Sequence, residues 1–219
     1  MAFGQGAVAD VWIAGAGVFE PNVSSFFEDN EDAHYQALRI NTDHPIKLTR
    51  IAMRSCLGAN KPGVVLILAS MAGIAGFYGS PLYCASKHAV VGFTKSMAQA
   101  DNDEHIKVVC VCPGIVSTPL WTGPDAVAVS KQYSYNDEMA ITPEEVAEAM
   151  KDMVEQGKFK GGSLLEVSKR NGRKQLESDE VPSAQDPEAQ AWIDGCYAPA
   201  RQVFMKERGT GLQSERKCI

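Results

Sequence analysis

The segment from Val64 to Lys87 constrains the fold of this chain more than any other stretch. It opens with the apolar run Val64–Leu68, whose length and β-branched content are typical of a buried strand. Three glycines and a proline then break the chain into turns: Gly73, Gly76, Gly79 and Pro81. Apolar residues next recur at helical spacing, which predicts a helix with Tyr83 and Lys87 one turn apart on one face. Ser70 falls where the strand ends.

This arrangement of Ser70, Tyr83 and Lys87 has chemical content. A phenol is protonated near neutral pH, so a tyrosine acts as a base only where its phenolate is stabilised. A lysine ammonium one turn away supplies that stabilisation, and a neighbouring hydroxyl can hold a substrate oxygen. The alternative for a bare Tyr-x-x-x-Lys is a buried tyrosine beside a lysine whose stem packs along apolar surface. Ser70, thirteen positions before Tyr83 across a strand end and a Gly-rich loop, favours the catalytic interpretation.

The same residues resemble a known family. The segments ILASMAG and PLYCASKHAVVGFTKSMA resemble the active-site segment of the short-chain dehydrogenase/reductase family, especially its hydroxyprostaglandin-dehydrogenase-like members. The resemblance covers roughly Val11 to Val167 and continues through four more stretches: VWIAGAGVFEP in altered form, INTDHPIKLTR, VVCVCPGIVSTPL and GGSLLEVS. It implies an α/β fold with a Rossmann-type, doubly wound parallel sheet.

The resemblance also implies catalytic roles for four residues. Tyr83 would be the general acid/base, and Lys87 would lower the pKa of the phenol and hold the nicotinamide ribose. Ser70 would hydrogen-bond the substrate oxygen. Asn41, 29 residues before Ser70, matches the family's helix asparagine, whose backbone carbonyl helps hold a water against the lysine.

For the cofactor, the resemblance points to two turns. The family's Asn-Asn-Ala-Gly turn is altered here to Ala14-Gly15-Ala16-Gly17, which loses both amides, and its Pro-Gly turn is kept in PGIVSTPL. The contacts to NAD or NADP are thereby assigned to eight residues: Ala16, Gly17, Tyr83, Lys87, Pro113, Gly114, Val116 and Thr118.

The family's first strands are missing from the sequence. Neither the Gly-rich turn TGxxxGxG, which receives the pyrophosphate, nor the residue that selects between NAD and NADP occurs. We therefore expect a sheet truncated at its amino-terminal side, starting near the family's fourth strand, with only the nicotinamide half of the cofactor site. The edge of the strand Val11–Ala14 would be exposed, which favours association unless it is covered.

The expected division of the chain is a catalytic domain over residues 1–168 and a polar tail over residues 169–219. The tail is expected to be partly disordered, with a weak helix near Pro187–Met205. Between the two active-site turns and this tail, the aromatic stretch Trp121–Ala140 falls where the family has its variable substrate loop. Its composition suits a small apolar alcohol or ketone, although its rings could merely pack the loop down.

The function implied is oxidoreduction between a secondary alcohol and a ketone with NAD(P). Two other classes remain open: a cofactor-independent isomerase, lyase or cyclase on the same Tyr/Lys site, and an inactive fragment or interaction module. The chain could be a piece of a longer dehydrogenase, a natural short form or a repurposed scaffold. In the family, the helices here expected at Tyr35–Cys56 and Leu82–Asp101 form the dimer interface, so a homo-oligomer is expected.

Composition excludes several partners. The net charge of −6 and the pI near 5.3 argue against a nucleic-acid-binding or anionic-membrane surface, and no apolar run is long enough to span a bilayer. The amino terminus MAFGQGAVAD has no secretory pattern, and six cysteines lack a framework spacing, so we expect a cytoplasmic protein. Cys110 and Cys112 alternate on a predicted strand as small buried hydrophobes, and no metal site is expected.

Overall fold

The computed structural model describes residues 7–20, 22–29, 34–177 and 187–210. The first six residues of the segment used for the localisation prediction, and Cys218, lie outside the described residues.

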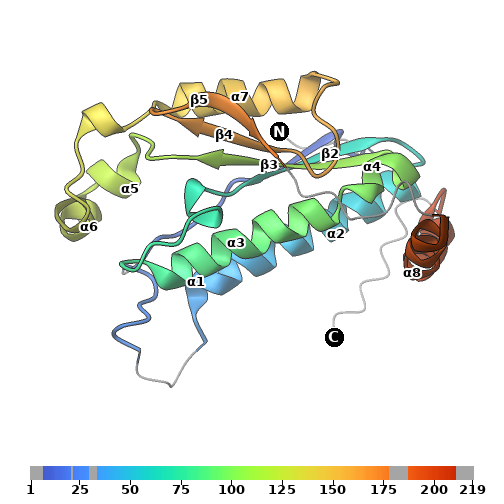
Figure 1. Ribbon diagram of the computed structural model, residues 1–219, viewed down its shortest axis with the longest axis horizontal. Coiled ribbons are helices and arrows are strands. Elements are labelled where there is room, and N and C mark those ends of the chain that lie inside the picture. Colours follow the sequence, from blue (N-terminus) through green and yellow to red (C-terminus); the bar gives the residue numbers. More distant parts are fainter. Residues whose placement is uncertain (1–6, 21, 30–33, 178–186, 211–219) are drawn as a thin grey trace.

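A five-stranded sheet forms the centre of the protein, in the order β1-β2-β3-β4-β5 (Figure 1). The first four strands are parallel, and β5 runs antiparallel to β4. Their bounds are β1 Val11–Ala14, β2 Gly63–Leu68, β3 Ile106–Pro113, β4 Leu164–Ser168 and β5 Gly172–Leu176. The inner strands β2 and β3 are almost continuously apolar because helices bury both of their faces.

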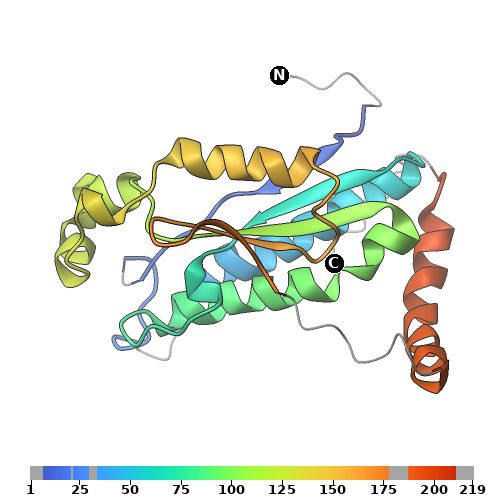
Figure 2. The ribbon, with the colours of Figure 1, turned by 45° about the horizontal axis from the view of Figure 1, so that its top comes forward.

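Helices cover both faces of this sheet, as the predicted doubly wound α/β fold requires (Figures 1 and 2). On one face, α2 (His44–Gly58) and α3 (Pro81–Ser96) bury alternate residues such as Val65 and Cys110. On the other face, α7 (Pro143–Glu155) packs on the residues between them, such as Leu66 and Val109. The strands β1 to β4 lie side by side in chain order, and α7 lies on the opposite face of the sheet from α2 and α3. The β3–β4 crossover through α7 therefore has the opposite hand to the crossovers through α2 and α3.

The helix expected at Tyr35–Cys56 consists of three pieces. They are α1 (Gln36–Leu38), a π-helical turn (Arg39–Asp43) and α2, with Pro45 in the first turn of α2. Proline has no N–H to donate to the carbonyl four residues earlier, which here belongs to Asn41. The helix accommodates Pro45 with a widened, π-helical turn directly before it.

Short helices connect the main helices and strands. A 3₁₀-helix (Met71–Gly73) lies between β2 and α3, and α4 (Gln99–Glu104) lies between α3 and β3. After β3 come α5 (Pro119–Thr122), a 3₁₀-helix (Pro124–Ala126), α6 (Val127–Gln132) and a second 3₁₀-helix (Asp137–Met139). The aromatic stretch Trp121–Ala140 therefore folds as a series of short helical turns beyond the carboxyl end of β3 (Figure 1).

The structure extends well past residue 168. β5 pairs with β4, and α8 (Pro187–Glu207) forms where a weak helix was expected. An ion pair between Arg50 and Glu207 joins α8 to α2, and Arg201 Nε lies 2.7 Å from Asp103 Oδ2 at the end of α4. Figure 2 shows α8 at the end of the molecule opposite α5 and α6. The division at residue 168 stays a prediction, but the sheet itself continues beyond it.

The edge strand β1 is exposed, as expected for an outer strand without a further neighbour. Val11 is 37% and Ile13 51% exposed, because α7 makes its main contacts with β2, β3 and β4. Within the described ranges, no helix combines the length and apolarity needed to cross a bilayer.

Candidate active site

A cavity of about 500 Å³ opens at the carboxyl ends of β1, β2 and β3. Gly17 reaches it from the loop after β1, Ser70 from the end of β2 and Gly114 from the end of β3. In parallel α/β sheets this edge is where ligands bind, because the loops after neighbouring strands meet there. Tyr83 and Lys87, from the first two turns of α3, complete the wall.

Lys87 is fixed at the back of this cavity. Its side chain is only 4% exposed, and its Nζ donates a 2.9 Å hydrogen bond to the carbonyl oxygen of Leu68 at the end of β2. The Nζ lies 5.6 Å from the centroid of the Tyr83 ring. The expected one-turn spacing thus brings an ammonium group next to the phenol.

Ser70 lies two residues after β2 and caps the amino terminus of the 3₁₀-helix Met71–Gly73. Its Oγ accepts a 3.1 Å hydrogen bond from the backbone N–H of Ala72, and it lies 3.4 Å from the carbonyl oxygen of Pro113. The Ser70 hydroxyl also lies near enough to Tyr83 to affect the pKa of its phenol. Ser70 and Tyr83 both line the cavity, where a ligand oxygen can meet them.

Burial controls the ionisation of both α3 residues. Burial raises the pKa of the Tyr83 phenol, and the neighbouring Ser70 hydroxyl opposes this only in part. Burial also lowers the pKa of Lys87 to about 8, while the nearby thiols of Cys110 and Cys112 act in the other direction. The lowering of the phenol pKa by Lys87 stays a prediction, and burial acts against it.

Asn41 lies behind the cavity and not in its wall. Asn41 is 1% exposed in the π-helical turn. Its Oδ1 accepts a hydrogen bond from the N–H of Val18, and its Nδ2 donates one to the carbonyl oxygen of Val18, both at 2.9 Å. Its Nδ2 also donates to the Oγ of Ser86 on α3, at 3.1 Å. The side chain thus ties the loop after β1 to the helix that carries Tyr83.

The residues expected at the cofactor divide into two groups. Gly17, Pro113, Gly114, Val116 and Thr118 line the cavity together with Tyr83 and Lys87. Ala16 is exposed and is not among the lining residues. Among the described residues, no group of three or more His, Cys, Asp or Glu side chains is close enough together to hold a metal ion.

Two residues of the site were missed in the sequence. Phe19 places its ring 4.6 Å from the Tyr83 ring, edge to face. Glu20 is 2% exposed, and its Oε2 accepts a 2.9 Å hydrogen bond from the backbone N–H of Tyr83. In the sequence both belong to an acidic, aromatic loop without periodicity, and nothing in that loop marks them as part of the site.

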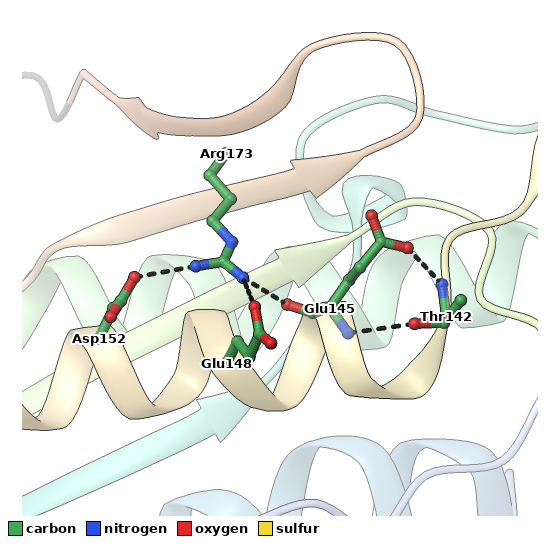
Figure 3. Close-up of polar contacts among 5 residues, drawn as sticks. All are labelled: Thr142, Glu145, Glu148, Asp152 and Arg173. Carbon is green, nitrogen blue, oxygen red and sulfur yellow. Dashed lines mark hydrogen bonds and ion pairs between the residues drawn. The ribbon is translucent and has the colours of Figure 1, made fainter.

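The helix α7, which contributes Val146 and Met150 to the cavity wall, is fixed to β5 by Arg173 (Figure 3). The guanidinium donates to Asp152 at 2.9 Å, to Glu148 at 2.6 Å and to the carbonyl oxygen of Glu145 at 3.4 Å. Thr142 and Glu145 form a capping box at the start of α7 (Figure 3). Polar contacts on the outer side of α7 therefore hold its inner side against the site.

Comparison with known proteins gives the family. The family model described as short chain dehydrogenase matches residues 6–126, which is more than half of the chain. The chain belongs to the short-chain dehydrogenase family. Its matched part includes β1, β2, α3, β3 and every predicted catalytic residue.

Relatives of this short-chain dehydrogenase are named as enzymes. It is 27% identical over 168 residues to 15-hydroxyprostaglandin dehydrogenase [NAD(+)] of Rattus norvegicus, covering 71% of this chain and 63% of that protein. It is 31% identical over 148 residues to the short-chain dehydrogenase/reductase cdmF of Talaromyces verruculosus, covering 62% and 57%. The chain thus spans about three fifths of the length of the curated relatives it matches.

Solved structures share its fold. A 4-hydroxyisoleucine dehydrogenase complexed with NADH matches with a TM-score of 0.60 at 22% identity, over 74% of this chain and 67% of that one. Acetoin dehydrogenase YohF from Salmonella typhimurium matches with a TM-score of 0.59 at 24% identity, over 75% and 68%. The Rossmann-type α/β architecture expected from the sequence is therefore confirmed.

Proposed function

We propose that this short-chain dehydrogenase carries the catalytic site of an NAD(P)-dependent oxidoreductase that interconverts a secondary alcohol and a ketone. One observation carries the proposal: Ser70 and Tyr83 line the wall of one cavity together with Lys87, whose Nζ lies 5.6 Å from the centroid of the Tyr83 ring. Relatives named as NAD(+) dehydrogenases support it.

Within this proposal, each residue has one task. The Tyr83 phenol gives its proton to the carbonyl oxygen during reduction, and the phenolate takes the alcohol proton during oxidation. The Ser70 hydroxyl donates a hydrogen bond to the same oxygen, which holds it beside the phenol. The Lys87 ammonium favours the phenolate by charge, against the burial that disfavours it. Asn41 keeps α3 and the loop after β1 in register around these groups.

The residues present fit the nicotinamide half of NAD(P), which when bound exchanges a hydride with the carbon that carries the reacting oxygen. A Cβ at Gly17 would lie 3.6 Å from Lys87 Nζ and 3.6 Å from Asn41 Oδ1, so glycine leaves room there for ribose hydroxyls to reach the ammonium. Val116 and Thr118 stand across the cavity, where they would hold the amide. No described helix begins directly after Gly15–Gly17, so no pyrophosphate contact is assigned.

The test is turnover of the purified chain with NAD⁺ or NADP⁺ and secondary alcohols, in the wild type and in Tyr83→Phe. We expect the variant to lose at least about 100-fold in kcat, because acid–base groups commonly contribute that much. Tyr78→Phe is the matched control, since Tyr78 lies five residues earlier and is 87% exposed. Retained turnover in Tyr83→Phe would remove the assignment.

A second candidate is a cofactor-independent isomerase, lyase or cyclase that uses the same Tyr83 and Lys87. The observation that favours it is that Ser70, Tyr83 and Lys87 line one cavity, where they can move protons without a redox cofactor. This candidate predicts turnover without added nicotinamide and no binding of NAD⁺, NADH, NADP⁺ or NADPH in a calorimetric titration.

A further inference from the structure

Three aromatic rings gather beside the catalytic tyrosine. The Phe19 ring lies 4.6 Å from Tyr83, 5.6 Å from Trp121 and 5.5 Å from Tyr133, and Trp121 lies 5.7 Å from Tyr133. They come from two separate segments, the loop after β1 and the turns α5 and α6. All three line the cavity, and we refer to Phe19, Trp121 and Tyr133 as the aromatic wall.

The aromatic wall has a firm backing. Tyr135 stacks on the outer side of Trp121, with ring centroids 5.4 Å apart and an interplanar angle of 8°. Phe19 itself is only 8% exposed. Rings held by other rings lose little freedom when a ligand packs on them, so such a wall suits a flat or cyclic ligand.

Charge is nearly absent from this cavity. Of the described side chains that line it, only Lys87 is ionised at neutral pH, and its Nζ already donates to the Leu68 carbonyl oxygen at the back. The remaining lining is mostly apolar and includes Met71, Leu120 and Met150, while Ser80 and Thr118 add only uncharged hydroxyl groups. An ionised group on the ligand's ring would lose its hydration without gaining a cation or a set of donors, which is costly.

We propose that the aromatic wall is the substrate subsite, and that it selects an uncharged alcohol or ketone with a ring attached directly, or through one bond, to the carbinol carbon. The proposal rests on the proposed function, because Tyr83 and Ser70 fix the position of the reacting oxygen. From that position the substituent on the carbinol carbon meets Phe19, whose ring is the neighbour of Tyr83, and then Trp121. A carboxylate on the ring would point into the apolar lining.

The experiment measures binding by calorimetry, without cofactor, so that it does not depend on turnover. Three probes are compared: 1-(2-naphthyl)ethanol, the same compound with a carboxylate at naphthalene carbon 6, and the acyclic 2-decanol. We expect the neutral naphthyl alcohol to bind at least tenfold more tightly than both others. Equal or tighter binding of the carboxylate, or no binding of the naphthyl alcohol by the folded protein, overturns the proposal.

A variant locates the binding. Trp121→Ala should weaken binding of the naphthyl alcohol at least tenfold while changing the affinity for 2-decanol less than threefold. Trp192→Ala is the matched control, because Trp192 is 70% exposed on α8 at the opposite end of the molecule. An equal loss for both ligands in Trp121→Ala, or an equal loss in the Trp192 variant, contradicts the subsite. Selective binding without any turnover with NAD(P) would instead retain the subsite and remove the proposed oxidoreductase.

Discussion

The carboxylate of Glu20 accepts a hydrogen bond from the backbone N–H of Tyr83, 63 residues further along the chain, at 2.9 Å. Tyr83 is the third residue of α3, and the residue before the helix, Ser80, makes no side-chain capping bond. Glu20 therefore supplies from another loop the acceptor that a helix start needs, and its charge suits the positive end of the helix. Its other oxygen accepts from the N–H of Phe26 at 3.3 Å.

Replacing Glu20 by Ala should both destabilise the fold and disturb the site. Two backbone donors lose their acceptor, so we expect a loss of about 1–2 kcal/mol in the free energy of unfolding, measured by urea denaturation. Glu20→Gln, which keeps one acceptor oxygen for the two N–H groups, should restore part of it. Glu28→Ala is the control, because Glu28 is exposed in the same loop. An effect of Glu28→Ala as large as that of Glu20→Ala would contradict the capping role.

Gly73 sets how closely the loop after Ser70 approaches α3. A Cβ at this position would lie 2.7 Å from the carbonyl oxygen of Lys87 and 2.9 Å from the Val91 side chain, so backbone has to move. Gly73→Ala should therefore cost about 1–3 kcal/mol in the free energy of unfolding, as overpacking does. Gly76→Ala on the same loop is the matched control, since its Cβ would meet nothing within 4 Å. Equal stability of the two variants would show that the contact is not tight.

The core of the site could be predicted because its signals are local. The apolar run before Ser70 and the helical spacing of Tyr83 and Lys87 each lie within one element, and the sheet brings the elements together. Glu20 could not be predicted in this way, because its partner lies 63 residues away and nothing in either segment marks the pair. The exposure of Ala16 could not be predicted either. The turn Ala14–Gly17 keeps the family's Ala-Gly pair but lacks the two asparagines before it.

The end of the chain was the least predictable part of the fold. β5, with the sequence GRKQL, has no apolar alternation because all but its last residue are exposed. It is a strand only because its backbone pairs with β4 and Arg173 reaches α7. α8 shows only a weak amphipathic pattern and is held by the ion pairs of Arg201 and Glu207 instead. Both depend on contacts with distant residues, which periodicity does not report.

The depressed pKa of Lys87 should appear in the pH dependence of stability. The pKa falls from 10.5 to about 8 on folding, so between these values the unfolded chain holds the proton and the folded chain does not. The free energy of unfolding must then rise with pH across this window, by up to about 3 kcal/mol. Above pH 10 the tyrosines of the unfolded chain ionise, and because the pKa of Tyr83 is raised in the folded protein, this ionisation opposes the rise.

The measurement is the difference in unfolding free energy between the wild type and Lys87→Met, from urea denaturation at pH 7, 8, 9 and 10. Groups such as Lys107, whose pKa is also lowered by burial, are present in both proteins and cancel. We expect the free energy of unfolding of the wild type to increase relative to that of Lys87→Met as the pH rises from 8 to 10. A difference that does not change with pH would contradict the buried ammonium.

The hydroxyl group of Tyr133 is buried, and among the described residues it has no hydrogen-bond partner. Tyr133→Phe keeps the ring in the aromatic wall and removes the unsatisfied group, so we expect a gain of about 1 kcal/mol in the free energy of unfolding. Tyr135→Phe is the matched control, because the Tyr135 hydroxyl donates a 2.8 Å hydrogen bond to Asp137 and its removal should bring no gain. Thermal and urea denaturation of the two variants side by side make the comparison. If Tyr133→Phe is less stable than the wild type, the hydroxyl has a partner in solution, and the apolar character assigned to the aromatic wall would have to be revised at this residue.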